Sequence, residues 1–168
     1  MILPDYARVM ARYNGWQNRL LAEALEGVPL AELTADRGAA FGSILGTLNH
    51  LLWADALWMS RLDPAFAPPA GGLADSAGLC PTLGVWEAER FVLDGRIAGW
   101  AAQLSAVRLA GEVRWPGAAG GEEMRRPVAL VVMHMFNQQA HHRAQVHAMM
   151  TAAGLAAPVS DLCGMPGP

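Results

Sequence analysis

Apolar residues recur every three to four positions along four stretches of the chain, which is the period of an amphipathic or buried helix. The first stretch runs from Pro4 to Glu26, and the second runs from Ser43 to about Leu62. The third extends from Thr82 to about Leu104, and the last extends from Pro127 to Gly154. Each begins with Pro, which suits a first helical turn, or with Ser or Thr, which are favourable N-caps. The pattern predicts four long helices.

The segments between these helices lack a helical period. Residues 63–81 are rich in Pro and Gly, which predicts a long loop. In residues 109–126 apolar and charged residues alternate on one side of a turn-rich stretch, which predicts a small β-hairpin. Residues 155–168 are expected to form an irregular tail. We therefore predict an all-α fold in a single domain covering residues 1–168: a four-helix bundle with a β-hairpin inserted before the last helix.

The last predicted helix is unusual in its polar residues. It carries four of the five histidines of the chain, and Arg143 is its only residue with a formal charge at neutral pH. A helix on the surface of a soluble protein normally has a charged stripe opposite its apolar one. We therefore expect the last helix to be covered on most sides by the rest of the protein.

The polar residues of this helix gather on one side. At about 100° per residue, a sector about 100° wide contains His134, Gln138, His141, His142 and Gln145. One interpretation is a solvent-facing stripe, or histidines that are hydrogen-bonded within a core. The other is a functional site, because a solvated stripe normally contains Lys, Glu or Arg.

Helix geometry limits which of these residues can bind one metal ion. His134 and His142 are eight residues apart in the sequence, about 12 Å along the axis, so they cannot share an ion. One turn before His142 the helix has Gln138, so a ligand pair on it would be Gln138 with His142. Pairs of Gln138 with His141 or with His134 are less favourable. A glutamine amide oxygen is neutral and binds a zinc- or nickel-like ion more weakly than imidazole does.

The fifth histidine, His50, lies in the second predicted helix, which is apolar nearly all round. A buried imidazole needs a hydrogen-bond partner. One interpretation gives His50 a structural bond to a backbone carbonyl, to Asn14 or to Asn18, and the other makes it a metal ligand facing the last helix. Asp55 and Asp161 are candidates for orienting an imidazole, but such polar residues are more often on the surface, which is the position we expect for both.

Composition excludes several classes of function. The formal net charge is −3, the pI is about 5.9, and no run of Lys or Arg occurs, so nucleic-acid partners are not expected. No apolar run approaches the roughly 18 to 20 residues of a membrane-spanning helix, so no membrane association is expected. Asp5 and Arg8 interrupt what would be the apolar part of a signal peptide. Cys80 and Cys163 have no CxxC spacing and are expected to be free thiols in the cytoplasm.

Three segments resemble the DinB/YfiT-like family of metal-dependent enzymes. They are YNGWQNRLLAEAL near the start, DRGAAFGSILGTLNHLLWADALWMSRL in the middle and HMFNQQAHHRAQVHAMM in the last helix. The resemblance spans nearly the whole chain in the same order, and GTLNHLL and HHRAQVHA are specific motifs. It implies a four-helix bundle that assembles as a homodimer and acts on a small-molecule substrate.

The resemblance also implies a divalent transition metal, of zinc or nickel type, held by three histidines. Characterised relatives are transferases and isomerases that use such a metal with a low-molecular-weight thiol. The ligand positions match His50, Gln138 and His142, but the family usually reads FNHQTHHRGQ where this chain reads FNQQAHHRAQ, so one imidazole is replaced by Gln138. The residues expected to line or support the site are His134, His141, Gln145, Asn14 and Asn18.

Two functions follow from this pattern. The first is a metal-dependent enzyme, a transferase acting with a thiol, in which Gln138 is a weak third ligand. The second is a metal-free, catalytically silent bundle that serves as a binding or dimerisation module. A further alternative, in which His134 or His141 replaces the missing ligand, requires a π-bulge near Asn137.

Overall fold

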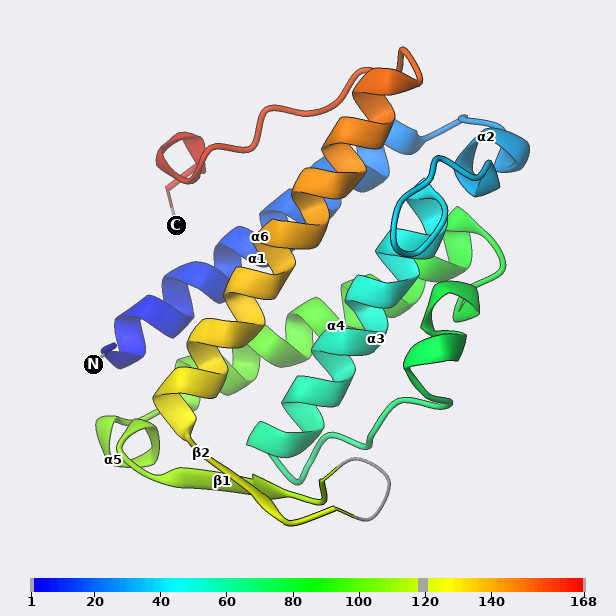
Figure 1. Cartoon of the computed structure of the whole chain (residues 1–168). Coiled ribbons are helices and arrows are strands. Elements are labelled where there is room, and N and C mark those ends of the chain that lie inside the picture. Colours follow the sequence, from blue (N-terminus) through cyan, green and yellow to red (C-terminus); the bar gives the residue numbers. More distant parts are fainter. Residues whose placement is uncertain (1, 118–120, 168) are drawn as a thin grey trace.

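The chain forms a bundle of four long helices in a computed structural model that describes residues 2–117 and 121–167. The long helices are α1 (Pro4–Leu25), α3 (Ile44–Leu62), α4 (Leu83–Gln103) and α6 (Val128–Ala152). α1 packs against α4 and α3 packs against α6, with further contacts between α3 and α4 and between α1 and α6 (Figure 1). The predicted fold class is confirmed, and the helix boundaries agree closely with the sequence pattern.

Local signals place the ends of the long helices. Ser43 Oγ accepts a hydrogen bond from the backbone N–H of Gly46 (3.0 Å), and Thr82 caps α4 in the same way. After α1 and α6, Gly27 and Gly154 adopt φ values of 74° and 71°. This left-handed conformation ends helices and is rarely adopted by residues other than glycine.

The predicted hairpin lies at the end of the bundle where α3 finishes and α6 begins (Figure 1). It consists of β1 (Glu112–Trp115) and β2 (Met124–Pro127), which pair antiparallel from Glu112 opposite Pro127 to Trp115 opposite Met124. Part of the predicted turn, residues 118–120, lies outside the described residues. Pro127 is the last residue of β2 and the N-cap of α6, rather than the first helical residue that the sequence suggested.

Four short elements were not predicted. They are α2 (Leu30–Thr34), the 3₁₀ turn η1 (Leu73–Gly78), α5 (Ala106–Leu109) and the 3₁₀ turn η3 (Leu162–Gly164). Each is too short to show hydrophobic periodicity, which needs a window of about 11 residues. η1 matters most, because it lies in the predicted long loop and contains the fully buried Ser76.

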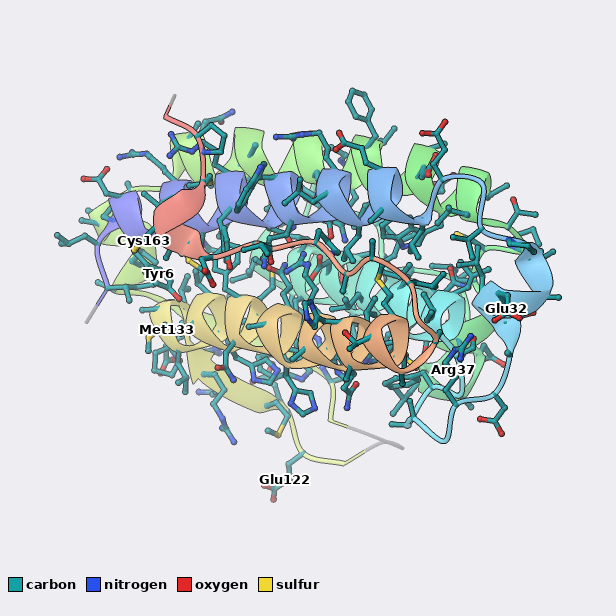
Figure 2. The ribbon with its side chains drawn as sticks, turned by 90° about the horizontal axis from the view of Figure 1, so that it is seen from above. Tyr6, Glu32, Arg37, Glu122, Met133 and Cys163 are labelled. Atoms are coloured by element: carbon teal, nitrogen blue, oxygen red, sulfur yellow. The ribbon has the colours of Figure 1, made fainter. Side chains whose placement is uncertain are left out.

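The C-terminal tail is attached to α1. Tyr13 Oη donates a hydrogen bond to the carbonyl oxygen of Ser160 (2.6 Å), and Gln17 Nε2 donates to Ser160 Oγ (3.0 Å). The tail, with Cys163 near its end, lies across α1 (Figure 2). Ser160 therefore holds the irregular tail in place.

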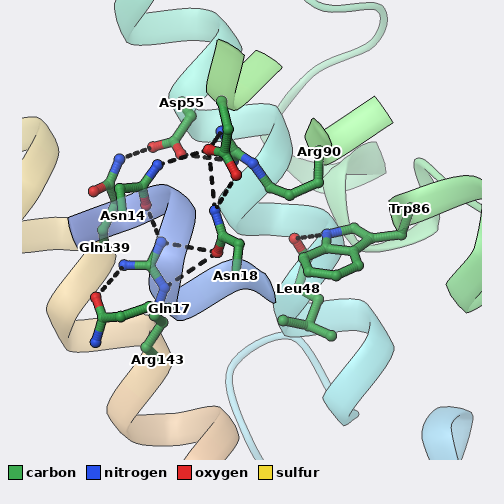
Figure 3. Close-up of polar contacts among 10 residues, drawn as sticks. Asn14, Gln17, Asn18, Leu48, Asp55, Trp86, Arg90, Gln139 and Arg143 are labelled. Atoms are coloured by element: carbon green, nitrogen blue, oxygen red, sulfur yellow. Dashed lines mark hydrogen bonds and ion pairs between the residues drawn. The ribbon is translucent and has the colours of Figure 1, made fainter. Parts of the chain in front are cut away.

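Polar side chains from all four long helices form a buried network inside the bundle (Figure 3). Its members are Asn14, Gln17 and Asn18 of α1, Asp55 of α3, Arg90 and Asp94 of α4, and Gln139 and Arg143 of α6. The Arg143 guanidinium donates to the side-chain oxygens of Asn14, Asn18 (2.9 Å) and Gln17 (3.2 Å). Burial lowers the pKa of Arg143 to about 10, so it remains charged at neutral pH. The network thus contains the only charge of the last helix.

Asp55 is the acidic centre of this network. Its carboxylate accepts hydrogen bonds from Arg90 Nη1 (2.7 Å) and Gln139 Nε2 (2.8 Å), and its side chain is 2% exposed. The surface position expected for Asp55 is therefore wrong, because Arg90 offsets the cost of desolvating the carboxylate. Burial is the largest influence on the pKa of Asp55 and raises it, although Arg90 opposes that shift.

One face of α6 is open to solvent, so the expectation that the last helix is covered on most sides is wrong. Leu130 and Met133 are 47% and 40% exposed, and the side chains of His134, His141 and His147 are exposed as well. This face carries no formal charge, because the only charged residue of the helix, Arg143, points inward. Within the described part of the chain, no helix is long and apolar enough to cross a membrane.

Replacing Asp55 with Asn is expected to lower the free energy of unfolding by about 3 kcal/mol, because the buried arginine loses part of its compensation. Urea unfolding followed by circular dichroism measures this change. The matched control is Glu123→Gln, which removes an exposed ion pair with Arg125 (3.0 Å) and is expected to have no measurable effect. Equal stability of Asp55→Asn and the wild type would contradict this role of the network.

Candidate functional site

His50 of α3 and His142 of α6 lie side by side. Their ring centroids are 4.7 Å apart, with the ring planes at 74°. The Phe41 ring stacks on the ring of His50, with centroids 3.6 Å apart and ring planes at 10°. His50 is 4% exposed and His142 is half-buried. The structure therefore brings together the two imidazoles that the sequence analysis assigned to facing helices.

A close backbone contact holds Phe41 beside α3. A Cβ atom at Gly46 would lie 2.2 Å from the carbonyl oxygen of Phe41, so the approach requires glycine at this position. The same carbonyl accepts a hydrogen bond from the backbone N–H of Ser43 (2.8 Å). The segment before α3 can therefore fold back against the first turn of that helix, and the Phe41 ring covers His50.

Hydrogen bonds determine which nitrogen of His50 carries the proton. Ser76 Oγ donates its single proton to the carbonyl oxygen of Leu73 (2.7 Å). It must therefore accept at its contact with His50 Nδ1 (3.1 Å), which means that His50 Nδ1 is protonated. The neutral ring then has its free lone pair on Nε2. This is the arrangement of a metal-ligating histidine whose other nitrogen is held by the protein.

His142 has the same arrangement. Its Nδ1 lies 2.8 Å from Gln145 Oε1, which can only accept a hydrogen bond, so Nδ1 donates and Nε2 has the lone pair. The amide nitrogen of Gln145 faces His141 Nε2 (3.4 Å). Gln145 therefore orients the ring of His142 and also contacts His141.

Both imidazoles are neutral at physiological pH. Burial, and then the neighbouring His142, lowers the pKa of His50 from 6.5 to about 4. Burial is also the main cause that lowers the pKa of His142, although the hydrogen bond to Gln145 opposes it. Neutral rings can bind a metal ion or accept a proton, whereas imidazolium rings can do neither.

Gln138, the candidate third ligand, makes a hydrogen bond elsewhere. Its Oε1 accepts from Trp58 Nε1 (2.9 Å), which leaves one lone pair on this oxygen. Among the described residues, no group of three or more His, Cys, Asp and Glu side chains could hold a metal ion. The candidate ligands are two imidazoles and one amide oxygen that already accepts a hydrogen bond. These groups suit an ion of zinc or nickel type, and they favour weak binding of the ion over tight binding.

The remaining predicted residues lie in two other places. His134 contacts Trp58, with ring centroids 4.6 Å apart, and this is the indole that donates a hydrogen bond to Gln138. The side-chain amide nitrogens of Asn14 and Asn18 each donate a hydrogen bond of 2.9 Å to the Asp94 carboxylate. Their amide oxygens accept hydrogen bonds from Arg143, so both residues belong to the buried network and do not support His50.

Sequence reasoning missed Phe41, Ser76 and Trp58. Phe41 precedes the N-cap Ser43 within the family-like segment, and its aromatic ring before a Gly-Ser cap was the one available signal. Ser76 lies in a Pro- and Gly-rich loop and had no local signal. Trp58 is eight residues after His50 on the same helix, but its polar bond to Gln138 depends on how two distant helices pack.

The chain matches the DinB family over residues 3–166, and it therefore belongs to this family. Its structure is similar to the crystal structure of a DinB-like protein from Bacillus cereus ATCC 10987. The TM-score is 0.64 at 14% sequence identity, and the match covers 86% of this chain and 90% of that chain. At this identity the similarity concerns the fold alone. No match was found among curated proteins.

The free energy of unfolding is expected to decrease as the pH falls from about 6.5 to about 4, because the unfolded chain binds a proton at His50 that the folded protein does not. Urea titrations at several pH values in this window measure the slope. His50→Gln removes this contribution, and Phe41→Ala weakens it by exposing the ring, so both variants should show a shallower slope. An unchanged slope in His50→Gln would contradict a buried neutral imidazole.

Proposed function

We propose that this DinB-family protein is a metal-dependent enzyme, a transferase that acts on a small molecule together with a low-molecular-weight thiol. The observation that carries the proposal is the pair of neutral imidazoles on facing helices, each with Nδ1 already bonded and Nε2 left with a lone pair. The two free cysteines, Cys80 and Cys163, support a reducing compartment such as the cytoplasm.

His50 and His142 would hold the ion, with the amide oxygen of Gln138 as a weaker third ligand. A divalent ion of zinc or nickel type, when bound, lowers the pKa of a thiol that reaches its open coordination position. The protein residues contribute the rest: Ser76 and Gln145 keep the two imidazoles oriented, and Phe41 keeps water from one face of His50.

A metal-free binding module is the second candidate function. It is favoured by the hydrogen bond from Trp58 Nε1 to Gln138 Oε1, which uses the position of the expected third imidazole for a contact between helices. In such a protein the family fold is kept without catalysis and serves for binding or dimerisation.

Titration calorimetry with Zn²⁺ and Ni²⁺, on protein without an affinity tag, distinguishes the two functions. We expect the wild type to bind one ion in the micromolar range and His142→Ala to lose it. Ser76→Ala should weaken binding by about 10- to 100-fold, because it releases the orientation of His50. Gln138→His should bind more tightly than the wild type, because imidazole is the stronger ligand.

The matched control is His147→Ala, which removes an exposed histidine of the same helix and should leave the affinity unchanged. Absence of binding to the wild type, together with tight binding to Gln138→His, would overturn the metal-dependent function and support the metal-free module.

We also propose a homodimer in which the outer face of α1 and α4 is the interface. A groove of about 870 Å³ runs between these helices over the small residues Ala11, Gly15 and Ala98. Phe91 and Val92, at its edge on α4, are 78% and 56% exposed. An apolar projection beside an apolar groove is complementary to itself under two-fold symmetry, so Phe91 of each protomer could fill the groove of its partner.

Replacing Phe91 with Asp is expected to convert the dimer to a monomer, because a carboxylate would be desolvated in the groove. Analytical ultracentrifugation measures the mass. The control is Val107→Asp, because Val107 is equally prominent at 85% exposure but lies on α5; this variant should remain dimeric. A dimer that persists in Phe91→Asp would place the interface elsewhere.

A further inference from the structure

A cation and two indole rings form a cluster at the end of α3, apart from the histidine pair. The Arg61 guanidinium carbon lies 4.4 Å from the ring centroid of Trp58 and 4.7 Å from that of Trp115. The two indole rings are nearly perpendicular, at 89°, with centroids 5.8 Å apart. The guanidinium thus sits in a corner made by two aromatic faces, one from α3 and one from β1.

Arg61 has no anionic partner in the described part of the chain. Across residues 2–117 and 121–167 no carboxylate lies within ion-pair distance of Arg61, and its side chain makes no hydrogen bond. The side chain is half-buried, and this desolvation lowers its pKa. By contrast, Arg108 nearby donates to the carbonyl oxygen of Leu62 (2.9 Å). None of the Arg61 nitrogens is both buried and without a partner, so the N–H edge of the guanidinium is open to solvent and an external anion can reach it.

A purely structural role accounts for only part of this arrangement. Arg61 lies in the last turn of α3, where a cation interacts favourably with the carbonyl end of the helix. The contacts with Trp58 and Trp115 also add cation–π stabilisation. Neither effect uses the five N–H donors of the guanidinium, whose planar fork matches a carboxylate.

The cluster faces the same side of α3 as His50. Arg61 is eleven residues after His50, about 16 Å along the axis and within about 20° in direction. Its guanidinium lies over Trp58, one turn closer to His50. Trp58 in turn contacts Gln138 and His134 on α6. A strip of polar and aromatic side chains, made of Trp58 with Gln138 and His134 against it, therefore lies along α3 and α6 between the level of His50 and Arg61.

We propose that Arg61, placed by Trp58 and Trp115, binds the carboxylate of a small organic acid at the far end of this strip. The indole faces hold the guanidinium in one plane and keep water from its faces, so its N–H edge can donate two parallel hydrogen bonds to a carboxylate. That the rest of the organic acid reaches His50 and His142 rests on the proposed function. Carboxylate binding at Arg61 itself does not require a metal.

The test uses metal-free protein in EDTA and follows the indole N–H signals by ¹H–¹⁵N NMR, with benzoate and its neutral analogue benzamide as probes. The signals of Trp58 and Trp115, assigned with Trp→Phe variants, should shift on adding benzoate, and benzamide should bind at least about tenfold more weakly. The signals of Trp86 and Trp100, which lie elsewhere in the bundle, should not move.

Arg61→Gln should weaken benzoate binding by at least about tenfold, and Arg61→Lys should fall between the two because it keeps the charge without the planar fork. Circular dichroism confirms that each variant is folded. The matched control is Arg96→Gln: Arg96 also lies over an aromatic ring, that of Phe66 at 4.0 Å, but it donates to the carbonyl oxygen of Ala65 (2.8 Å). Benzoate binding unchanged in folded Arg61→Gln, or a wild type that prefers benzamide, would overturn the proposal.

A second titration tests which molecule carries the carboxylate: the thiol itself, or the acceptor molecule that reacts with the thiol. Glutathione is compared with its diethyl ester in the wild type and in Arg61→Gln. A preference for glutathione that is lost in Arg61→Gln assigns the carboxylate to the thiol, and equal affinities assign it to the acceptor. Because the NMR test contains no metal, its failure leaves the metal-dependent function standing, and failure of metal binding leaves the role of Arg61 standing.

Discussion

The buried guanidinium of Arg143 is the group on which the packing of α6 depends. A charge inside a helical bundle must be surrounded by acceptors, and α1 supplies three amide oxygens at one level of the bundle. This requirement sets the rotation of α6 about its axis. Consecutive residues on a helix point about 100° apart, so turning Arg143 toward α1 turns His142 toward α3. The polar network and the histidine pair are consequences of the same rotation.

Asp55 has the corresponding effect on α3. Its bonds to Arg90 and Gln139 direct one side of α3 toward the interior, and His50, five residues earlier, faces a different neighbour. Ser76 then completes the orientation of His50 from a loop that has no regular pattern in the sequence. The candidate site is therefore built on rigid helices, whereas the hydrogen bond that selects the ring nitrogen comes from a short 3₁₀ turn.

Gln138 distinguishes this chain from the usual family pattern. Its hydrogen bond to Trp58 joins α3 and α6 at the position where a third imidazole is expected, and Trp58 also supports Arg61. One side chain therefore connects α6 with the aromatic cluster at the end of α3. An amide oxygen is a weaker metal ligand than imidazole, so Gln138 can contribute less to metal binding than an imidazole at this position would.

The sequence by itself determined the long helices, the hairpin and the family, because hydrophobic periodicity, the caps at Ser43 and Thr82 and the motif around His50 are recorded in neighbouring residues. Only the tertiary structure decided that Asp55 is buried, that Asn14 and Asn18 bind Arg143 rather than His50, and that one face of α6 is exposed. Burial of a polar group depends on whether a partner from a distant segment compensates its desolvation. Such partners lie many residues apart, so no local pattern reports them.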